Sequence, residues 1–198
     1  MAAMRPECPD MDFSKLLLRD VSISARGAKT AAVAQENGER ILFNLSEEPL
    51  VSPFGACSFG DEQLTRRTIE WSLSPEQVEF WQTFDDWAVA YIAKHSERLF
   101  KKTMTRDQVL SGYKSPVTTK EGGQYAPHLR TKINLAGAAT CRFWNEENVR
   151  NELVSELRGI PCIPRVQISH MWAMSKEFGF VINITDLKTL QQPEDCPF

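Results

Sequence analysis

Residues 129–144 read LRTKINLAGAATCRFW, and this stretch decides the fold that the sequence predicts. Apolar residues alternate with polar and charged ones on both sides of Ala136-Gly137-Ala138. Because successive side chains of a strand point to opposite faces, we predict two strands, 129–135 and 139–144, that pair as a hairpin. One face of this pair is apolar. The other carries three cations and an indole: Arg130, Lys132, Arg142 and Trp144.

Three cations beside an indole suit a single-stranded nucleic acid, because the cations neutralise phosphates while the ring stacks on a base. A solvated sheet face, with one Trp covering the end of a barrel, is the alternative interpretation of the same residues.

The composition is that of a globular protein. At 198 residues the chain is long enough to bury one sizeable core, and its 42% hydrophobic and 25% charged residues are typical values. No apolar run approaches the roughly 20 residues that span a bilayer, and the first residues lack the apolar segment of a signal peptide. We therefore expect no membrane contact and a reducing compartment, nucleus or cytoplasm. Five widely spaced cysteines without a CxxC motif predict neither disulfides nor a zinc site.

The charge is unevenly distributed along the chain. The net charge is −3, yet residues 94–132 contain nine Lys or Arg against three Asp or Glu. A basic centre in an acidic body directs an anion to one region. We expect a flexible N-terminus at 1–11, one domain at 12–190 and an acidic tail at 191–198.

The best-marked element is a long helix from Pro75 to about Phe100. Ser74 is its N-cap, Gln77 completes a capping box, and apolar residues recur every three or four positions. Thr105 with Gln108 marks a second, short helix at 106–110. Apolar spacing predicts a further helix over 145–158.

Alternation predicts the remaining strands. Asn37-Gly38 is a strong hairpin-turn signal between 31–35 and 40–45. Residues 65–73 form a half-buried strand with Trp71 on its core face. A closing hairpin joins 166–172 to 178–184, with Val166, Ile168, His170 and Trp172 expected on one face. The predicted class is α+β: an antiparallel OB-like β-barrel with a long helical insertion and a short second helix.

Two loops are candidates for ligand contacts. The segment 113–127 carries Tyr113, Lys114, Lys120 and Tyr125, and such a loop can fold over a nucleic-acid chain; a plain surface loop is the alternative. The segment 49–60 pairs aromatic residues with glycines, as in Phe54-Gly55, and we favour a loop that plugs the barrel end over a ligand contact.

No motif indicates catalysis. The three histidines have no metal-ligand spacing, and the glycine-rich and nucleophile-elbow motifs are missing. The adjacent carboxylates Asp85-Asp86 point about 100° apart on a helix, which prevents them from sharing a site. We predict a non-catalytic protein without cofactor or metal.

Several blocks together resemble a known family. They are VSPFGACSF at 51–59, SERLFKK at 96–102, YKSPV at 113–117, YAPHLRTKI at 125–133 and WAMSKEFGF at 172–180. In this order they resemble a family from nucleocytoplasmic large DNA viruses and some protists that includes OB-like single-stranded-DNA-binding proteins, and the resemblance covers residues 12–190. It implies binding of single-stranded DNA in replication or repair. A protein-interaction module on the same barrel and a single-stranded-RNA binder are the alternatives.

Residues 192–198, QPEDCPF, resemble the acidic Pro-Phe tip of bacterial single-stranded-DNA-binding proteins. The resemblance implies that Phe198, Asp195 and Glu194 contact a replication or repair protein. A chain that ends in Phe by chance is the alternative.

Overall fold

The computed structural model describes residues 11–23, 27–58, 65–119, 126–153 and 157–190. The predicted tail contacts Glu194, Asp195 and Phe198 lie outside these residues, as do Lys120 and Tyr125.

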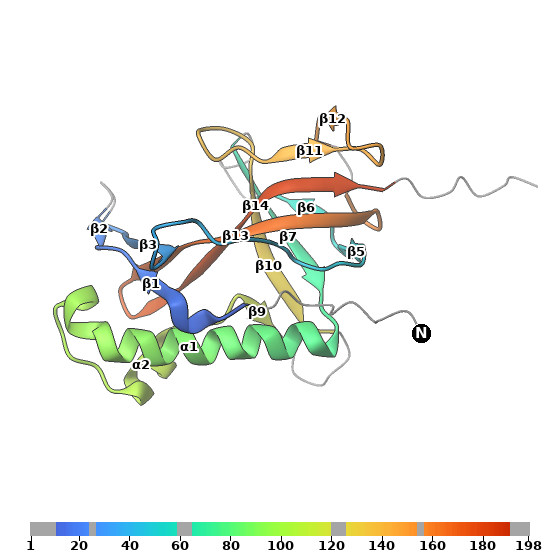
Figure 1. The fold of residues 1–198 in the computed structure, drawn as a ribbon. Helices are drawn as coiled ribbons and strands as arrows, with labels where there is room; N and C mark the ends of the chain where they lie inside the picture. The colour runs from blue at the N-terminus through green and yellow to red at the C-terminus, as the bar shows by residue number, and fades with distance from the viewer. Residues whose placement is uncertain (1–10, 24–26, 59–64, 120–125, 154–156, 191–198) are drawn as a thin grey trace, which may run out of the picture.

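The sheet is built around one long hairpin of β13 (Pro161–Met174) and β14 (Glu177–Thr189) (Figure 1). Short strands follow one another along both edges of this hairpin. Antiparallel to β13 run β3 (Lys29–Gln35), β4 (Leu42–Asn44) and β5 (Leu50–Val51). Parallel to β14 run β8 (Tyr113–Lys114), β10 (His128–Asn134) and β11 (Arg142–Trp144). The closing hairpin of the sequence prediction is therefore confirmed, and it is longer than predicted.

The predicted hairpin of 129–135 with 139–144 is wrong. Both β10 and β11 run parallel to β14, so the two run in the same direction and cannot form a hairpin with each other. Lys132 pairs with Asn183, and Arg142 pairs with Asp186 farther along the same strand.

The predicted hairpin around Asn37-Gly38 is corrected in the same way. The turn forms, with Gly38 at φ 85° and its N–H donated to the Gln35 carbonyl at 2.9 Å. Its two arms, β3 and β4, pair in series with β13 and form no ladder with each other. The long β13 offers both arms a common edge, and local turn chemistry does not encode that choice.

The main path of the sheet is β1-β3-β13-β14-β10-β7-β6. At its ends lie β1 (Leu16–Leu18) on one side, and β7 (Arg66–Ser72) and β6 (Ala56–Cys57) on the other. The short strands β2 (Ser22–Ile23), β9 (Val117–Thr118) and β12 (Arg150–Asn151) are added beside this path. The α+β class is confirmed. The closed antiparallel barrel is corrected to an open, mixed sheet, because within the described residues no ladder joins β1 to β6.

Both capped helices form where the sequence predicts them. In α1 (Pro75–Phe100), Ser74 and Gln77 make the reciprocal capping box, and Lys101 ends the helix at φ 59°. In α2 (Arg106–Gly112), Thr105 and Gln108 do the same. A short 3-10 helix, η1 (Phe13–Lys15), precedes β1. The helix predicted over 145–158 is wrong for its described residues, where a turn with Asn148 at φ 61° leads into β12.

The core lies between α1 and the inner face of the sheet (Figure 1). Trp81, Phe84 and Ile92 of α1 have no exposed surface, and the Phe84 ring centroid lies 5.1 Å from that of Phe180 on β14. Trp71, also fully buried as predicted, donates its indole N–H to the Thr131 hydroxyl at 2.9 Å. With α1 on the inner face, the outer face is the side of the sheet on which a ligand can lie.

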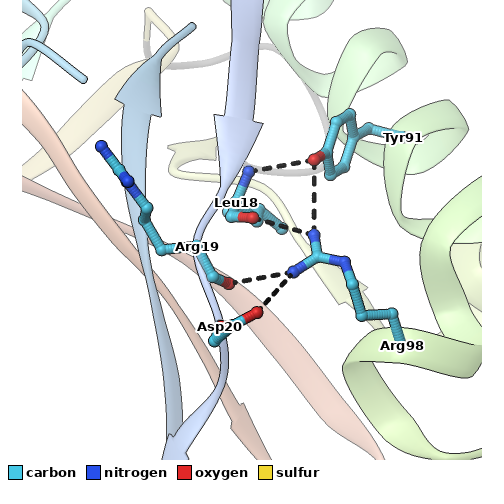
Figure 2. Close-up of polar contacts among 5 residues, drawn as sticks. All are labelled: Leu18, Arg19, Asp20, Tyr91 and Arg98. Atoms are coloured by element: carbon cyan, nitrogen blue, oxygen red, sulfur yellow. Dashed lines mark hydrogen bonds and ion pairs between the residues drawn. The ribbon is translucent and has the colours of Figure 1, made fainter. Parts of the chain in front are cut away.

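Side chains of α1 also form hydrogen bonds with backbone groups on the open edge of β1 (Figure 2). The Leu18 N–H is donated to the Tyr91 hydroxyl at 3.1 Å, and the Leu18 carbonyl accepts from Arg98 Nη2 at 2.8 Å. An unpaired strand edge is a template for association with another chain. These contacts occupy the Leu18 N–H and carbonyl on that edge. Neither described helix is long and apolar enough to cross a membrane.

Candidate nucleic-acid interface

A β-bulge in β13 turns two side chains to the outer face of the sheet. Ile168 pairs with Ile182 and His170 with Val181, which leaves Ser169 as the extra residue. An extra residue reverses the alternation of a strand. Met171 and Ala173 therefore continue the buried row of Ile168, whereas His170 and Trp172 face outward. The prediction that His170 and Trp172 share a face with Ile168 is wrong for this reason.

The indole of Trp172 lies directly on the backbone of β14. A Cβ placed on Gly179 would lie 3.2 and 3.3 Å from two of its ring carbons and 2.6 Å from the Lys114 carbonyl oxygen. Only glycine leaves room for this approach. Trp172 is half-buried, so part of its surface remains open on the outer face.

Two cations of β10 lie beside it on the same face. Arg130 donates from Nε and Nη2 to Glu70 Oε1, at 3.0 and 2.9 Å, and Lys132 Nζ donates to the Thr68 hydroxyl at 2.6 Å. The predicted alternation of this strand is confirmed, because the intervening Leu129, Thr131 and Ile133 are fully buried.

Two hollows meet at these cations. The first, of about 250 Å³, lies between them, Trp172 and the segment 114–118. The second, of about 360 Å³, lies between them, Thr68, Glu70 and the loop of Phe54. Arg130 and Lys132 line both hollows. We name this surface the cross-sheet groove; its side chains are Phe54, Thr68, Glu70, Lys114, Arg130, Lys132 and Trp172.

An aromatic ring stands at each outer side of the groove. Opposite Trp172, the Phe54 side chain is 51% exposed, and its ring centroid lies 5.7 Å from that of His128. A residue that plugs the end of a barrel would be buried, so for Phe54 the predicted plug is wrong. The exposed ring is available to a ligand.

The carboxylates of this region are held in ion pairs whose cations are exposed. Lys114 Nζ lies 3.0 Å from Glu177 Oε1, and both side chains are more than half exposed. In the pair of Arg130 with Glu70 the guanidinium is 57% exposed, whereas the carboxylate is 23% exposed. Exposed pairs are worth about 0–1 kcal/mol, so a phosphate can compete with the carboxylate for the cation.

Arg142 and Trp144 form a separate cluster around Asp186. Arg142 lies 2.7 Å from the Asp186 carboxylate, and the Trp144 indole N–H is donated to it at 3.0 Å. Burial raises the pKa of Asp186, but the hydrogen bonds from Arg142, Trp144 and Thr185 outweigh burial, and its pKa is lowered. The structure thus divides the predicted four-residue face into two clusters, with Arg130 and Lys132 in one.

The Tyr113 side chain packs on the core side of its segment. Its hydroxyl donates to Asp85 Oδ1 at 2.6 Å, and its ring packs near Phe178 and Phe180. Ser115 donates to the other Asp85 oxygen at 2.6 Å. Asp85 therefore ties the segment that carries Lys114 to α1, and the Tyr113 hydroxyl is engaged in this bond.

The sequence reasoning missed Trp172 and Glu70 as groove residues. Trp172 was missed because its outward position depends on the bulge at Ser169. Glu70 was visible as a polar position of an alternating strand, but the partner strand that brings it to Arg130 was not.

Metal ligands and buried thiols can be compared in the part of the chain that the structure describes. No group of three or more His, Cys, Asp or Glu side chains is placed there to hold a metal ion. Burial raises the pKa of the Cys141 and Cys162 thiols to about 12, so both stay protonated near neutral pH.

Comparison with known proteins identifies no family. No family model matches the chain, and no curated relative was found. Two solved structures of the single-stranded DNA-binding protein from bacteriophage Enc34 are similar. A C-terminal truncation has a TM-score of 0.43 at 10% identity and covers 91% of this chain and 98% of that chain. A complex with single-stranded DNA has a TM-score of 0.42 at 12% identity and covers 92% and 95%. The predicted viral and protist family stays a prediction.

Proposed function

We propose that this chain binds single-stranded DNA in the cross-sheet groove, without catalysis, and acts in DNA replication or repair. One observation carries the proposal: Arg130 and Lys132 line two adjacent hollows, and each hollow has an aromatic ring on its outer side. Cations between aromatic platforms suit a backbone that turns its phosphates to the centre and its bases to the sides.

The shape of the groove favours a single strand over a duplex. Bases that stack on aromatic side chains must be unpaired, because a duplex hides their faces. The hollows of about 250 and 360 Å³ are separate, and each has room for an individual base. In this binding mode Trp172, fixed on Gly179, is a rigid stacking surface, whereas Phe54 is a more exposed one.

Anisotropy titration of labelled oligo-dT against an equal length of duplex tests the proposal. We expect oligo-dT to bind more tightly, with a log–log salt slope of about −2 if Lys114, Arg130 and Lys132 each neutralise one phosphate. Trp172→Ala should weaken binding by about 1–3 kcal/mol, the value of one stacked base. Oligo-rU of the same length shows whether the groove prefers DNA or RNA.

Matched controls separate this site from general charge. Arg106 of α2 pairs with the Asp86 carboxylate at 3.0 Å and is 63% exposed, close to the 57% of Arg130, although Asp86 is more exposed than Glu70. Arg130→Ala should flatten the salt slope, and Arg106→Ala should leave it unchanged. Equal affinity for duplex, or equal effects of the two Arg variants, would contradict binding in the cross-sheet groove.

A further inference from the structure

A second hollow, of about 570 Å³, lies at the turn of the β13–β14 hairpin. The end of α1, the start of the segment toward α2, and the hairpin turn surround it (Figure 1). It shares no lining residue with the cross-sheet groove. We name it the turn groove; the side chains used below are Lys29, Phe100, Lys102, Met174, Lys176 and Phe178.

The floor of the turn groove is apolar and its rim is basic. Phe178 is 4% exposed at the floor, and Met174 is 61% exposed at the rim. Methionine adapts its shape to an incoming apolar group. Lys29, Lys102 and Lys176 make no ion pair with any side chain in the described ranges. In the groove lining these three lysines outnumber one carboxylate, Glu177, which lies 3.0 Å from Lys114. The groove therefore suits an acidic peptide that carries a large apolar side chain.

The chain contains such a peptide just after β14. Residues 193–198 read PEDCPF, with Glu194 and Asp195 four and three residues before Phe198. Two carboxylates match the basic rim, and the Phe ring matches the apolar floor.

Residues 190–198 follow the end of β14 that lies far from its own turn groove. Measured along the strand, β14 extends about 40 Å from the turn at Glu177 to Thr189, at about 3.3 Å per residue. The nine residues from Leu190 to Phe198 span at most about 30 Å when fully extended. Because the chain leaves β14 at the end opposite the turn groove, the groove of a second copy is the one that the peptide reaches without folding back along its own sheet.

We propose that residues 193–198 of one copy dock in the turn groove of the next copy. This contact joins different surfaces of the two copies, and such head-to-tail contacts generate open arrays where the rotation between copies does not close a ring. Insofar as it concerns DNA, the proposal rests on the proposed function: the cross-sheet groove lies between the two ends of each copy, so an array would cover one strand cooperatively.

Charge reversal in the full-length chain tests the docking. Sedimentation velocity over a range of concentrations should show self-association of the unmodified chain. Lys102→Glu with Lys176→Glu should reduce association about tenfold, and so should Glu194→Lys with Asp195→Lys. Combining the four changes should restore it, because the charges then match again. Lys94→Glu, on the exposed side of α1 outside the groove, is the control and should change nothing.

Binding to two lengths of oligo-dT separates this proposal from the proposed function. An oligonucleotide of about 10 nucleotides has room for one copy, and the charge-reversed variants should bind it as the unmodified chain does. On an oligonucleotide several times longer, they should lose the extra affinity that neighbouring copies give. If the short oligonucleotide binds to no variant, the proposed function is wrong, and sedimentation still decides the docking.

Three results would overturn the docking. One is a chain whose sedimentation does not depend on concentration. Another is a fourfold variant that fails to recover association although its circular dichroism is native. The third is a tail reversal that alters binding to the short oligonucleotide while the groove reversal has no effect, since this places the tail on the cross-sheet groove.

Discussion

Arg98, in the last turn of α1, donates from Nη2 to the carbonyl oxygen of Leu18 on strand β1 at 2.8 Å (Figure 2). The same guanidinium lies 3.3 Å from the Arg19 carbonyl and 3.5 Å from Asp20. β1 is the first strand of the sheet path and pairs with β3 alone. The helix therefore completes the hydrogen bonding of the edge strand on the side that no strand covers.

Arg98→Ala should lower the free energy of unfolding by about 1 kcal/mol. The lost bonds involve a charged donor, but Arg98 is 39% exposed, and water can replace part of them. Urea unfolding followed by circular dichroism measures the change. Arg106→Ala removes an ion pair whose arginine is 63% exposed, and it should cost less. Equal losses would show that the bonds to β1 contribute nothing beyond a surface pair.

The sequence predicted the local features of the fold well. Both capping boxes depend on residues three positions apart, Ser74 with Gln77 and Thr105 with Gln108, and both formed. The strand pairing was missed because it depends on β13 and β14, which lie far along the chain. Asn37-Gly38 did make its turn, yet the flanking strands found a longer partner in β13.

The candidate site shows the same difference between local features, which the sequence predicted, and strand pairing, which it did not. Arg130 and Lys132 share a face because they lie on one strand, which alternation reveals. Arg142 joined them in the prediction only through a hairpin that does not form. Trp172 was assigned to the wrong face because one extra residue, Ser169, reverses the alternation. No residue type in that segment indicates a bulge.

Gly179→Ala should weaken both folding and binding. The added Cβ would lie 2.6 Å from the Lys114 carbonyl, so the backbone must shift and the Trp172 ring must tilt. Overpacking of this kind costs about 1–3 kcal/mol of stability. Urea unfolding and titration with short oligo-dT measure the two effects.

Gly112→Ala is the control for this prediction. A Cβ on Gly112 would lie 2.5 Å from the Lys176 carbonyl oxygen, so this position is as crowded as Gly179. Gly112 does not line the cross-sheet groove. This variant should lose stability and keep its affinity for short oligo-dT. A parallel loss of affinity in both variants would mean that Trp172 is not a binding surface.

Glu70→Gln should raise the affinity for single-stranded DNA two- to fivefold, as expected for the loss of an ion pair worth about 0.5–1 kcal/mol. The substitution removes a negative charge from the groove and releases the Arg130 guanidinium to a phosphate. Titration at two salt concentrations should show the gain shrink as salt rises. Asp86→Asn, which releases Arg106 outside the groove, should give no gain. A lower affinity would mean that Glu70 is needed to orient Arg130.

The last prediction concerns stability below neutral pH. Burial, and next the positive charge of Arg66, lower the pKa of His170 below its ordinary 6.5. The unfolded chain therefore binds more protons than the folded chain once the pH falls below 6.5, and stability must fall in that window. His95 acts in the same sense, because burial, Arg98 and Lys94 lower its pKa. Asp85, whose pKa burial raises, acts in the opposite sense nearer its ordinary 3.8.

Urea unfolding at pH 7.5 and 5.5 of the unmodified chain, His170→Gln and His95→Gln isolates the His170 contribution. The unmodified chain should lose stability at pH 5.5, and His170→Gln should lose less, since glutamine takes up no proton. Because Asp85 is present in all three chains, its effect cancels in the differences. His95 is the more exposed of the two rings, so His95→Gln should flatten the pH dependence less than His170→Gln does. An unchanged pH dependence in His170→Gln would show that this imidazole is as free to take up a proton in the folded sheet as in the unfolded chain.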